Sequence, residues 1–364
     1  MSAVEVVSST GAMPIPFESL AHGIGEGLRF ASWNDALPVW RSALATLPGA
    51  TLYHGERWLE ALRTCYGSDL RVVTLHRRGE LRAAAVFAYS KRLFSSRLVS
   101  IPFSDCGEVL AVDDEARAEF MRALGSSNQA KSMEVRGTAG AAPWVNVDCF
   151  AHWTLDLDHS FADLYSALSR TVRNGVKRGR KGGIQIERGT GIDLISRYFE
   201  LQLETRRRLG VPPQPLKFFK SVHEKFSVNG DCEVWFATKE GRDLAGLVLL
   251  REGDLLGYKW GARTEGAHPG ANHLLVVSVL EEYAGKARSM DFGRCDSRNE
   301  GLVNSKIYMG CTSRPLPYAF IPTAPRHISS EVLSGPAKVL SSAWKRLPLW
   351  ATRLLGAAMY RYVA

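Results

Sequence analysis

The sequence lacks most of the features that would decide its class at once. No apolar run approaches the ~20 residues that a membrane-spanning helix needs. It has no GxSxG elbow, no HExxH pair and no P-loop, so the usual signatures of serine hydrolases, zinc proteases and nucleoside triphosphatases are missing. Its six cysteines are scattered, without CxxC pairs or histidines at zinc spacing. We therefore expect reduced, mostly buried thiols, a cytoplasmic protein and no metal.

The composition is that of a globular protein with an excess of positive charge. A length of 364 residues predicts two domains. The net charge of +9 and the pI near 9.3 indicate an anionic partner, such as nucleic acid, a phosphate-bearing cofactor or an anionic lipid surface. Simple solubility is the alternative explanation. The first 20 residues have neither the basic leader nor the apolar core of a secretory signal.

The C-terminal segment 338–362 alternates aromatic and aliphatic residues with lysine and arginine. Trp344, Trp350 and Leu354 lie among Lys345 and Arg353. One interpretation is an interfacial amphipathic segment on an anionic membrane. The other is a helix whose apolar side packs against the protein itself.

Periodicity predicts the same order of elements twice. The first half reads as a strand at 28–31, helices at 35–47 and 56–66, strands at 70–76, 81–90 and 98–102, a helix at 114–124 and a strand at 132–136. The second half reads as a strand at 184–187, helices at 192–208 and 215–226, strands at 232–238, 244–251 and 255–262, a helix at 272–288 and a strand at 290. This repeat favours a duplicated α/β unit over two unrelated domains.

The segment 289–318 combines an apolar strand, a charged turn, a short helix and a closing strand. Chemistry is often found where a rigid strand meets a polar loop. Asp296 and Glu300 are candidates to accept a proton, and Arg294 and Asn299 are candidates to position a substrate. An ordinary strand, loop and helix with a solvated charged face is the alternative.

A second candidate is the basic helix expected within 161–181. Its apolar residues fall on one stripe, while Arg170, Arg173 and Lys177 fall on the other. That charge could hold phosphates of a lipid-linked precursor, a nucleotide sugar or transfer RNA. A solvated helix is the alternative, and the lack of aromatic residues on the basic stripe does not indicate base stacking.

Five sequence segments carry a family resemblance. They are SRTVRNGVKRGRKGGIQIE, TRRRLGVPPQPLKFF, YKWGAR with the following ANHLLVVSVLEEYA, DFGRCDSRNEGLVNSKIYMG, and RPLPY. Together they resemble the Fem-type aminoacyltransferases of the GNAT superfamily and the related acetyltransferases linked to cellulose or exopolysaccharide synthesis. The resemblance implies an α/β fold of mixed sheets, in which two GNAT units occur in tandem and an amphipathic helical tail follows. The expected divisions are a flexible arm at 1–27, a first domain at 28–158, a second domain with the active site at 159–325, and the tail at 326–364.

The resemblance also implies roles for individual residues. Lys306 matches the lysine of a Phe-Lys-x-x-x-Gly-like motif and would stabilise the oxyanion of acyl transfer, although Ser305 and Met309 depart from that motif. Arg206 precedes a bend that would border the acceptor groove. Tyr258, Lys259 and Trp260 would line the same cleft, and strand alternation places Tyr258 and Trp260 on one face.

The resemblance places a cofactor pyrophosphate at the start of the helix that follows the fourth strand. Here that start reads Gly270, Ala271 and Asn272, without the arginine-rich, glycine-spaced loop typical of acetyl-CoA sites. The co-substrate is therefore expected to be an acyl-CoA or an aminoacyl-tRNA, with the departure favouring the second.

The leading hypothesis is an acyltransferase that moves an acyl or aminoacyl group to an amine of a cell-envelope, peptidoglycan or exopolysaccharide precursor. The alternatives are an acetyl-CoA-dependent N-acetyltransferase acting on an amino sugar or small metabolite, and a non-catalytic scaffold of envelope polysaccharide assembly. Expected partners are an anionic or lipid-linked precursor, aminoacyl-tRNA and the inner face of the cytoplasmic membrane. No DNA partner is expected.

Overall fold

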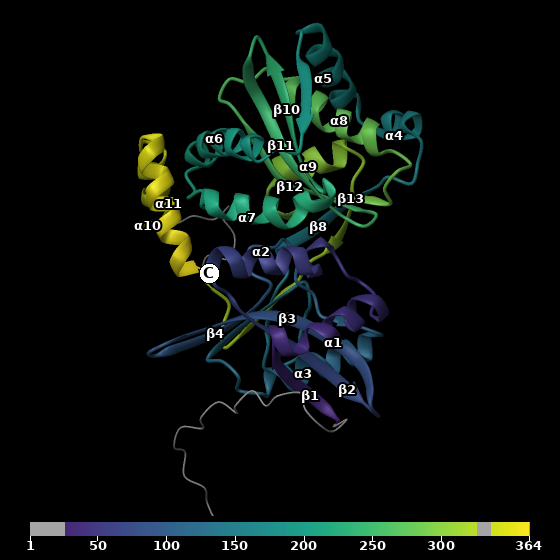
Figure 1. Ribbon diagram of the computed structural model, residues 1–364, viewed down its shortest axis with the longest axis vertical. Coiled ribbons are helices and arrows are strands. Elements are labelled where there is room, and N and C mark those ends of the chain that lie inside the picture. The colour runs from purple at the N-terminus through teal and green to yellow at the C-terminus, as the bar shows by residue number, and fades with distance from the viewer. Residues whose placement is uncertain (1–25, 326–335, 364) are drawn as a thin grey trace, which may run out of the picture.

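Two mixed β-sheets with helices packed on them make up the molecule (Figure 1). This computed structural model describes residues 26–325 and 336–363. The arm expected at 1–27 falls almost entirely outside the described residues, and so does the start of the tail expected at 326–364. Among the described residues, no helix is both long and apolar enough to span a bilayer.

The first half of the chain folds into short helices and antiparallel strands. Its elements are β1 (Gly27–Ser32), α1 (Trp33–Thr46), the 3-10 helix η1 (Leu52–His54), α2 (Glu56–Tyr66), β2 (Asp69–Arg77), β3 (Glu80–Arg92), β4 (Ser95–Ser100), β5 (Leu110–Ala111), α3 (Asp114–Gly125), β6 (Ser132–Arg136) and β7 (Val145–Val147).

The second half repeats this order after two inserted helices. Its elements are β8 (Phe150–Asp156), α4 (Phe161–Ala167), α5 (Arg170–Lys181), β9 (Gln185–Gly189), α6 (Ile192–Leu209), α7 (Leu216–Phe226), the 3-10 helix η2 (Ser227–Asn229), β10 (Cys232–Lys239), β11 (Arg242–Glu252), β12 (Leu255–Arg263), α8 (Ala271–Tyr283), β13 (Ser289–Asp296), α9 (Glu300–Tyr308) and β14 (Thr312–Pro315). The chain ends with β15 (Tyr318–Ile321), α10 (Pro336–Trp344) and α11 (Leu349–Val363).

The two sheets have the same pairing pattern, which confirms the predicted duplication. The first sheet runs β1-β2-β3-β4-β6-β15-β7 and the second runs β9-β10-β11-β12-β13-β8-β14. In each, the only parallel pair among the described strands is the central one, β4 with β6 and β12 with β13. That pairing covers only 97–99 with 132–134 and 255–257 with 289–291. Beyond these residues the central strands part and leave room between them.

The expected boundary between 158 and 159 differs from what the sheets show. β8 precedes that boundary but pairs with β13 and β14 of the second sheet. β15 lies far beyond it but pairs with β6 and β7 of the first sheet. The chain therefore crosses between the domains twice. Periodicity identifies a strand but carries no information about which sheet it joins.

Capping residues explain several helix ends. The Asp113 side chain accepts the N–H of Ala116 at the start of α3. α6 ends at Gly210, whose φ of +72° is a conformation that glycine adopts without strain. The helix expected across 161–181 is interrupted, because Leu168 is extended and the Ser169 side chain accepts the N–H of Val172 to start α5.

The two domains share a buried core. Trp58 of α2 packs against Phe218 of α7 with ring centroids 5.6 Å apart, and both rings are fully buried. Arg57 of α2 pairs with Asp231 at 2.7 Å and with Glu252 at 2.9 Å. The domain interface is thus both apolar and ionic, and it holds the facing loops in fixed positions.

Candidate active site

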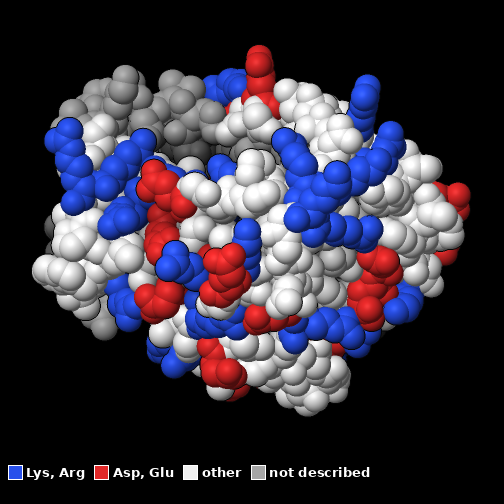
Figure 2. Space-filling view, turned by 90° about the horizontal axis from the view of Figure 1, so that it is seen from above, with Lys and Arg blue, Asp and Glu red and all other residues white. Residues whose placement is uncertain are grey.

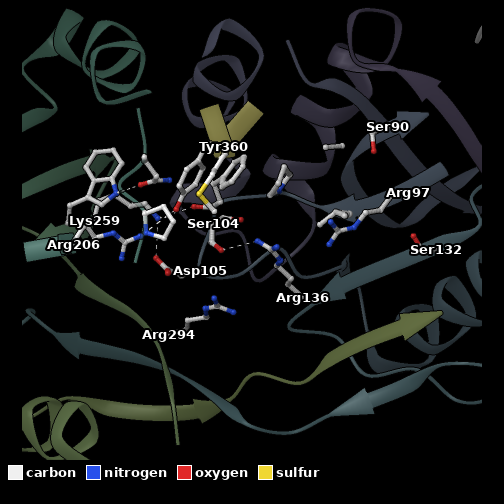
Figure 3. A pocket seen from close by; sticks show the side chains of 18 of the residues that line it. Ser90, Arg97, Ser104, Asp105, Ser132, Arg136, Arg206, Lys259, Arg294 and Tyr360 are labelled. Atoms are coloured by element: carbon white, nitrogen blue, oxygen red, sulfur yellow. Dashed lines mark hydrogen bonds and ion pairs between the residues drawn. The ribbon is translucent and has the colours of Figure 1, made fainter. Parts of the chain in front are cut away.

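A cavity of about 670 Å³ lies between the two domains, where the central strands of each sheet part (Figure 3). We call it the interdomain pocket. Its walls come from β3, β4 and β6 of the first domain and from α6, β12 and β13 of the second, with the end of α11 closing one side. Its charged lining residues are Arg92, Arg97, Arg136, Arg206, Lys259, Arg294 and a single acid, Asp105. The pocket is therefore strongly cationic.

Three predicted substrate-binding residues meet in this pocket. Arg206, in the last turn of α6, lies 3.5 Å from the Tyr360 hydroxyl through its Nη2. Trp260 donates through Nε1 to the Gln214 side chain at 3.2 Å. Arg294 donates to the Tyr318 hydroxyl at 2.6 Å. These side chains are held in place by neighbours from several elements, so the arrangement is preorganised.

The prediction that Tyr258 and Trp260 share a face is wrong. In the register of β11 and β12, Val248 pairs with Trp260 while its neighbour Leu249 pairs with Tyr258. Lys259 is therefore an extra residue in β12, and such a β-bulge cancels the alternation of side chains. Tyr258 packs against Phe292 in the core on the other side of the sheet, whereas Trp260 and Lys259 line the pocket.

Lys259, one of the three residues of β12 expected to line the cleft, forms the centre of a buried cluster. Its side chain is 5% exposed, and its Nζ lies 3.2 Å from Oδ2 of Asp105 and 3.3 Å from the Tyr53 hydroxyl. It also lies over the rings of Tyr53 and Trp58, 4.4 Å and 4.6 Å from their centroids. The Tyr53 hydroxyl donates to the same Asp105 oxygen.

Of the two partners of Lys259, Asp105 is deprotonated and Tyr53 is protonated. Burial by itself would raise the pKa of Asp105, but the Lys259 ammonium and the Tyr53 hydroxyl outweigh it and lower that pKa to about 2. Burial, followed by the nearby Asp105 carboxylate, raises the pKa of Tyr53 well above its usual value. Asp105 is therefore an anion and Tyr53 a neutral donor across the physiological pH range.

Lys306, the predicted catalytic lysine, lies behind the pocket wall. It comes from α9, and its Nζ donates to the carbonyl oxygens of Phe292 at 2.7 Å and Gly293 at 3.0 Å. Burial lowers the pKa of Lys306, while Asp105 and other anionic groups oppose that shift. A side chain at Gly293 would lie 3.1 Å from Asp105. One strand backbone thus separates Lys306 from the cluster.

His152 of β8 and Asp291 of β13 form a further pair across neighbouring strands. His152 Nε2 lies 2.8 Å from Asp291 Oδ1, which also accepts the Gly293 N–H at 2.6 Å. Both line a second cavity of about 180 Å³. Sequence reasoning missed His152 because β8 was not among the expected strands, and only the pairing of β8 with β13 brings it to Asp291.

Three of the predicted residues lie outside the lining of the interdomain pocket and have local contacts of their own. Both Asp296 oxygens accept from Arg298, at 3.0 Å and 2.8 Å. The Asn299 side chain caps α9 by accepting the Leu302 N–H at 3.0 Å. Glu300 is exposed in the first turn of α9, where its charge favours the helix dipole.

The basic residues of α5 form a separate surface. Arg170 and Lys177 are exposed, and an open groove of about 630 Å³ runs along the helix beside Lys177, Arg178 and Lys181. Seen from above, Lys and Arg side chains gather on this end of the molecule (Figure 2). Arg173 instead donates to the carbonyl oxygens of Ser166 and Leu168, which end α4. The predicted substrate-binding residues are thus split between two places.

The predicted cofactor loop is covered by α5. Gly270 and Ala271 are buried, and a side chain at Gly270 would lie 2.5 Å from backbone atoms of both Gly175 and Gly179. The Gly270 N–H is taken by His268 Nδ1 at 3.1 Å, while Asn272 is half-buried one residue further. A pyrophosphate therefore has no room against Gly270 and Ala271, contrary to what an open cofactor loop requires. In the part of the chain that the structure describes, no group of three or more His, Cys, Asp or Glu side chains is placed to hold a metal ion.

Comparison with known proteins agrees with this fold. Residues 166–300 match the family model described as an acetyltransferase (GNAT) domain. The structure is similar to that of FemX, with 15% identity and a TM-score of 0.58 over 78% of this chain and 95% of FemX. It is also similar to L-PGS from Bacillus licheniformis, with 11% identity and a TM-score of 0.52 over 85% of this chain and 97% of that one. A search of curated proteins found no match.

Proposed function

Because this chain carries a GNAT acyltransferase domain within a FemX-like tandem fold, we propose that it transfers an aminoacyl group to an amine of an anionic cell-envelope, peptidoglycan or exopolysaccharide precursor. One observation carries this proposal. The interdomain pocket brings six basic side chains and one acid together at a point where both domains contribute.

The pocket is suited to an acceptor that carries phosphate or carboxylate groups. Arg97 and Arg136 are partly neutralised by Glu134, at 2.6 Å and 2.8 Å. Arg206 and Arg294 instead contact the hydroxyls of Tyr360 and Tyr318, and neither forms an ion pair with a carboxylate among the described residues. Guanidinium groups bind such oxyanions in a forked geometry, which makes these two arginines the proposed anchors.

In the proposed step the acceptor amine attacks the carbonyl carbon of an activated ester. A C–N bond forms, the C–O bond to the donor breaks, and the proton that the amine loses ends on the leaving oxygen of the donor. The tetrahedral intermediate carries a negative oxygen that needs a positive or donating group nearby. Lys306 is the proposed source of that charge at the β13 backbone, and the His152 and Asp291 pair is the proposed proton acceptor. Asp296 and Glu300 stay as the sequence-based alternatives for the acceptor role.

Two observations favour an aminoacyl-tRNA over an acyl-CoA as the donor. The start of α8, where a CoA pyrophosphate would lie, is covered by α5. The opposite side of α5 exposes Lys177, Arg178 and Lys181 over an open groove. A polyanion can bind such a surface through its phosphates. Because charged tRNAs and nucleotide-linked precursors are made in the cytoplasm, the proposed location is the cytoplasmic side of the membrane.

The test offers the purified protein two labelled donors in parallel, acetyl-CoA and a tRNA pool charged with amino acids. The acceptor is a UDP-linked muramyl peptide with a free amine, and the readout is label in a new amide. We expect transfer from charged tRNA. Arg206→Gln and Arg294→Gln should each raise KM for the acceptor about tenfold, because each removes one charged hydrogen bond.

The control variant is Arg41→Gln, which removes an exposed arginine that pairs with Glu56 and does not line the pocket. Its KM should equal that of the wild type. Label from acetyl-CoA alone would replace the proposal with the acetyl-CoA-dependent alternative. No label from either donor, together with normal growth of cells that carry the Arg294 variant, would favour the scaffold alternative.

A further inference from the structure

Two exposed apolar elements flank the interdomain pocket. The first is the tip of the β3–β4 hairpin, where Leu93 is 87% exposed and Phe94 is 81% exposed. The second is the outer face of α11, where Trp350 is 68% exposed and Leu354 is 64% exposed. Large apolar side chains this exposed are costly in water, and groups of them usually mark a contact surface.

Both elements lead directly into the pocket. Arg92 and Ser95, on either side of the hairpin tip, belong to the pocket lining. Met359 and Tyr360, at the end of α11, belong to it as well. Figure 1 shows the hairpin and α11 projecting on the same side of the molecule. The mouth of the pocket therefore lies between the two apolar elements.

The exposed face of α11 is not needed to hold the helix on the protein. The opposite face performs that role, since Ala351 and Thr352 are buried and Gly356 packs against Pro213. Arg353 also pairs with Glu200 of α6 at 2.5 Å. The described residues thus leave the apolar outer face of α11 exposed, so that another molecule can contact it.

The charged residues that belong to the two segments themselves are all of one sign. The hairpin segment 90–97 contains Lys91, Arg92 and Arg97 and no acid. Lys131 adds a further cation, because its Nζ donates to the Phe94 carbonyl at 3.1 Å. The sequence from 332 to 364 contains no Asp or Glu, and exposed Lys345 and Arg346 precede α11. A partner for these two elements must therefore have an apolar interior beneath an anionic surface.

We propose that this surface docks onto an anionic lipid bilayer. Leu93 and Phe94 enter the interface as one wedge, and Trp350 and Leu354 enter as a second. The surrounding lysines and arginines contact the lipid headgroups. The pocket then opens toward the headgroup layer, so that a lipid-linked acceptor reaches it from the membrane. That route of entry rests on the proposed transferase function, whereas docking itself does not.

The test is flotation of the full chain with vesicles of pure phosphatidylcholine or with about a third phosphatidylglycerol, a composition that gives an anionic surface. We expect the protein to float with the anionic vesicles, and less so at high salt because screening weakens headgroup contacts. The double variants L93S/F94S and W350S/L354S should each lower the partition coefficient about tenfold or more.

The control is I192S/V228S, which removes two exposed apolar residues of α6 and η2 that do not line the pocket. It should bind vesicles like the wild type. All of these side chains are exposed, so melting temperatures should be unchanged, and a variant that melts early is replaced by the matching lysine-to-glutamine change at Lys91 or Lys345.

Three results would overturn the proposal. One is the absence of flotation with anionic vesicles. Another is equal flotation of the control and the two double variants. The third is a wild-type dimer in solution that the double variants convert to a monomer, because a second copy would then cover this surface. Support would come from double variants that no longer float with anionic vesicles but still transfer label to the water-soluble muramyl peptide. That result would separate docking from the chemistry. Failure of transfer with normal flotation would affect the proposed function alone.

Discussion

Lys259 of the second domain and Asp105 of the first form an ion pair across the domain interface, with Nζ 3.2 Å from Oδ2. The lysine is an extra residue in β12, and the aspartate comes from the loop after β4. Tyr53 donates to the same aspartate oxygen. The Asp105 carboxylate is therefore contacted by two side chains that come from distant parts of the sequence. The pair joins the two domains, and both of its charged groups lie in the wall of the interdomain pocket.

Removing one partner of this pair should destabilise the protein. Lys259→Met leaves Asp105 without its main counter-charge, and we expect a loss of about 3 kcal/mol in the free energy of unfolding. Urea denaturation measures it. The matched control is Arg288→Met, whose exposed pair with Asp254 should be worth less than about 1 kcal/mol. If both variants lost the same small amount, the Lys259 pair would have no special role.

The Asp105 carboxyl should make stability depend on pH at the acid end. Its pKa falls from the ordinary 3.8 to about 2 on folding. Its contribution is therefore complete above 3.8 and is lost as the pH falls through 2. This corresponds to about 2 kcal/mol. Asp105→Asn should show a flatter decline in the free energy of unfolding between pH 5 and 2 than the wild type. An unchanged slope would argue against the assigned pKa.

The contact of α5 with α8 should not tolerate a methyl group. Gly270→Ala places a carbon 2.5 Å from backbone atoms of Gly175 and Gly179, so the helices must separate. We expect a loss of about 1–3 kcal/mol. Gly301→Ala is the matched control, since its new carbon meets nothing closer than 3.5 Å and alanine favours a helix.

In the same melting experiment, acetyl-CoA should not raise the melting temperature of the wild type. A clear rise would contradict the covered cofactor loop.

Lys306 should affect turnover more than acceptor binding. Lys306→Met removes the ammonium that lies on the carbonyl oxygens of Phe292 and Gly293. If that charge stabilises the oxyanion, kcat should fall about 100-fold while KM changes little. Lys220→Met, at an exposed position of α7, is the control. A variant that melts early but turns over at the normal rate would show that Lys306 only supports the β13 backbone.

The basic surface of α5 should bind tRNA. Replacing Lys177, Arg178 and Lys181 with glutamine should lower tRNA affinity, and the slope of log affinity against log salt should shrink by about 2. Filter binding over a salt series measures both.

The control for this triple variant replaces three exposed basic residues on other elements. They are Arg122, Lys220 and Arg242. Their replacement removes the same net charge and should leave the slope unchanged. Equal losses in the two triple variants would mean that net charge, and not the α5 surface, attracts tRNA.

Local periodicity predicted most elements well, because the signals that set them are local. The helix at 56–66 and the strand at 132–136 match α2 and β6 residue for residue. The strands at 145–156 were missed, since β7 is short and exposed and β8 mixes His152 and Thr154 into its apolar pattern. The helix expected across 161–181 failed at Leu168 and Ser169, where a capping hydroxyl competes with the helical backbone.

The candidate site was predictable only in part. Arg206, Trp260 and Arg294, all named from the sequence, line the interdomain pocket because α6, β12 and β13 bring them there. Lys259 was expected near the cleft, but its side of the strand could not be assigned, because the β-bulge that turns it inward depends on pairing with β11. Asp105 and His152 were also beyond reach, since neither stands in a motif and each meets its partner only across a domain or a sheet.

The sequence by itself determined the duplicated order of helices and strands, the excess of positive charge and the apolar face of the tail, since each depends on neighbours along the chain. Only the tertiary structure decided that β8 and β15 exchange sheets, that α5 covers the start of α8, and that a cationic pocket lies between two exposed apolar elements. These features depend on contacts between residues that lie far apart in the sequence, such as Gly179 with Gly270. Such contacts form only when burial of the shared core outweighs the entropy of bringing distant segments together.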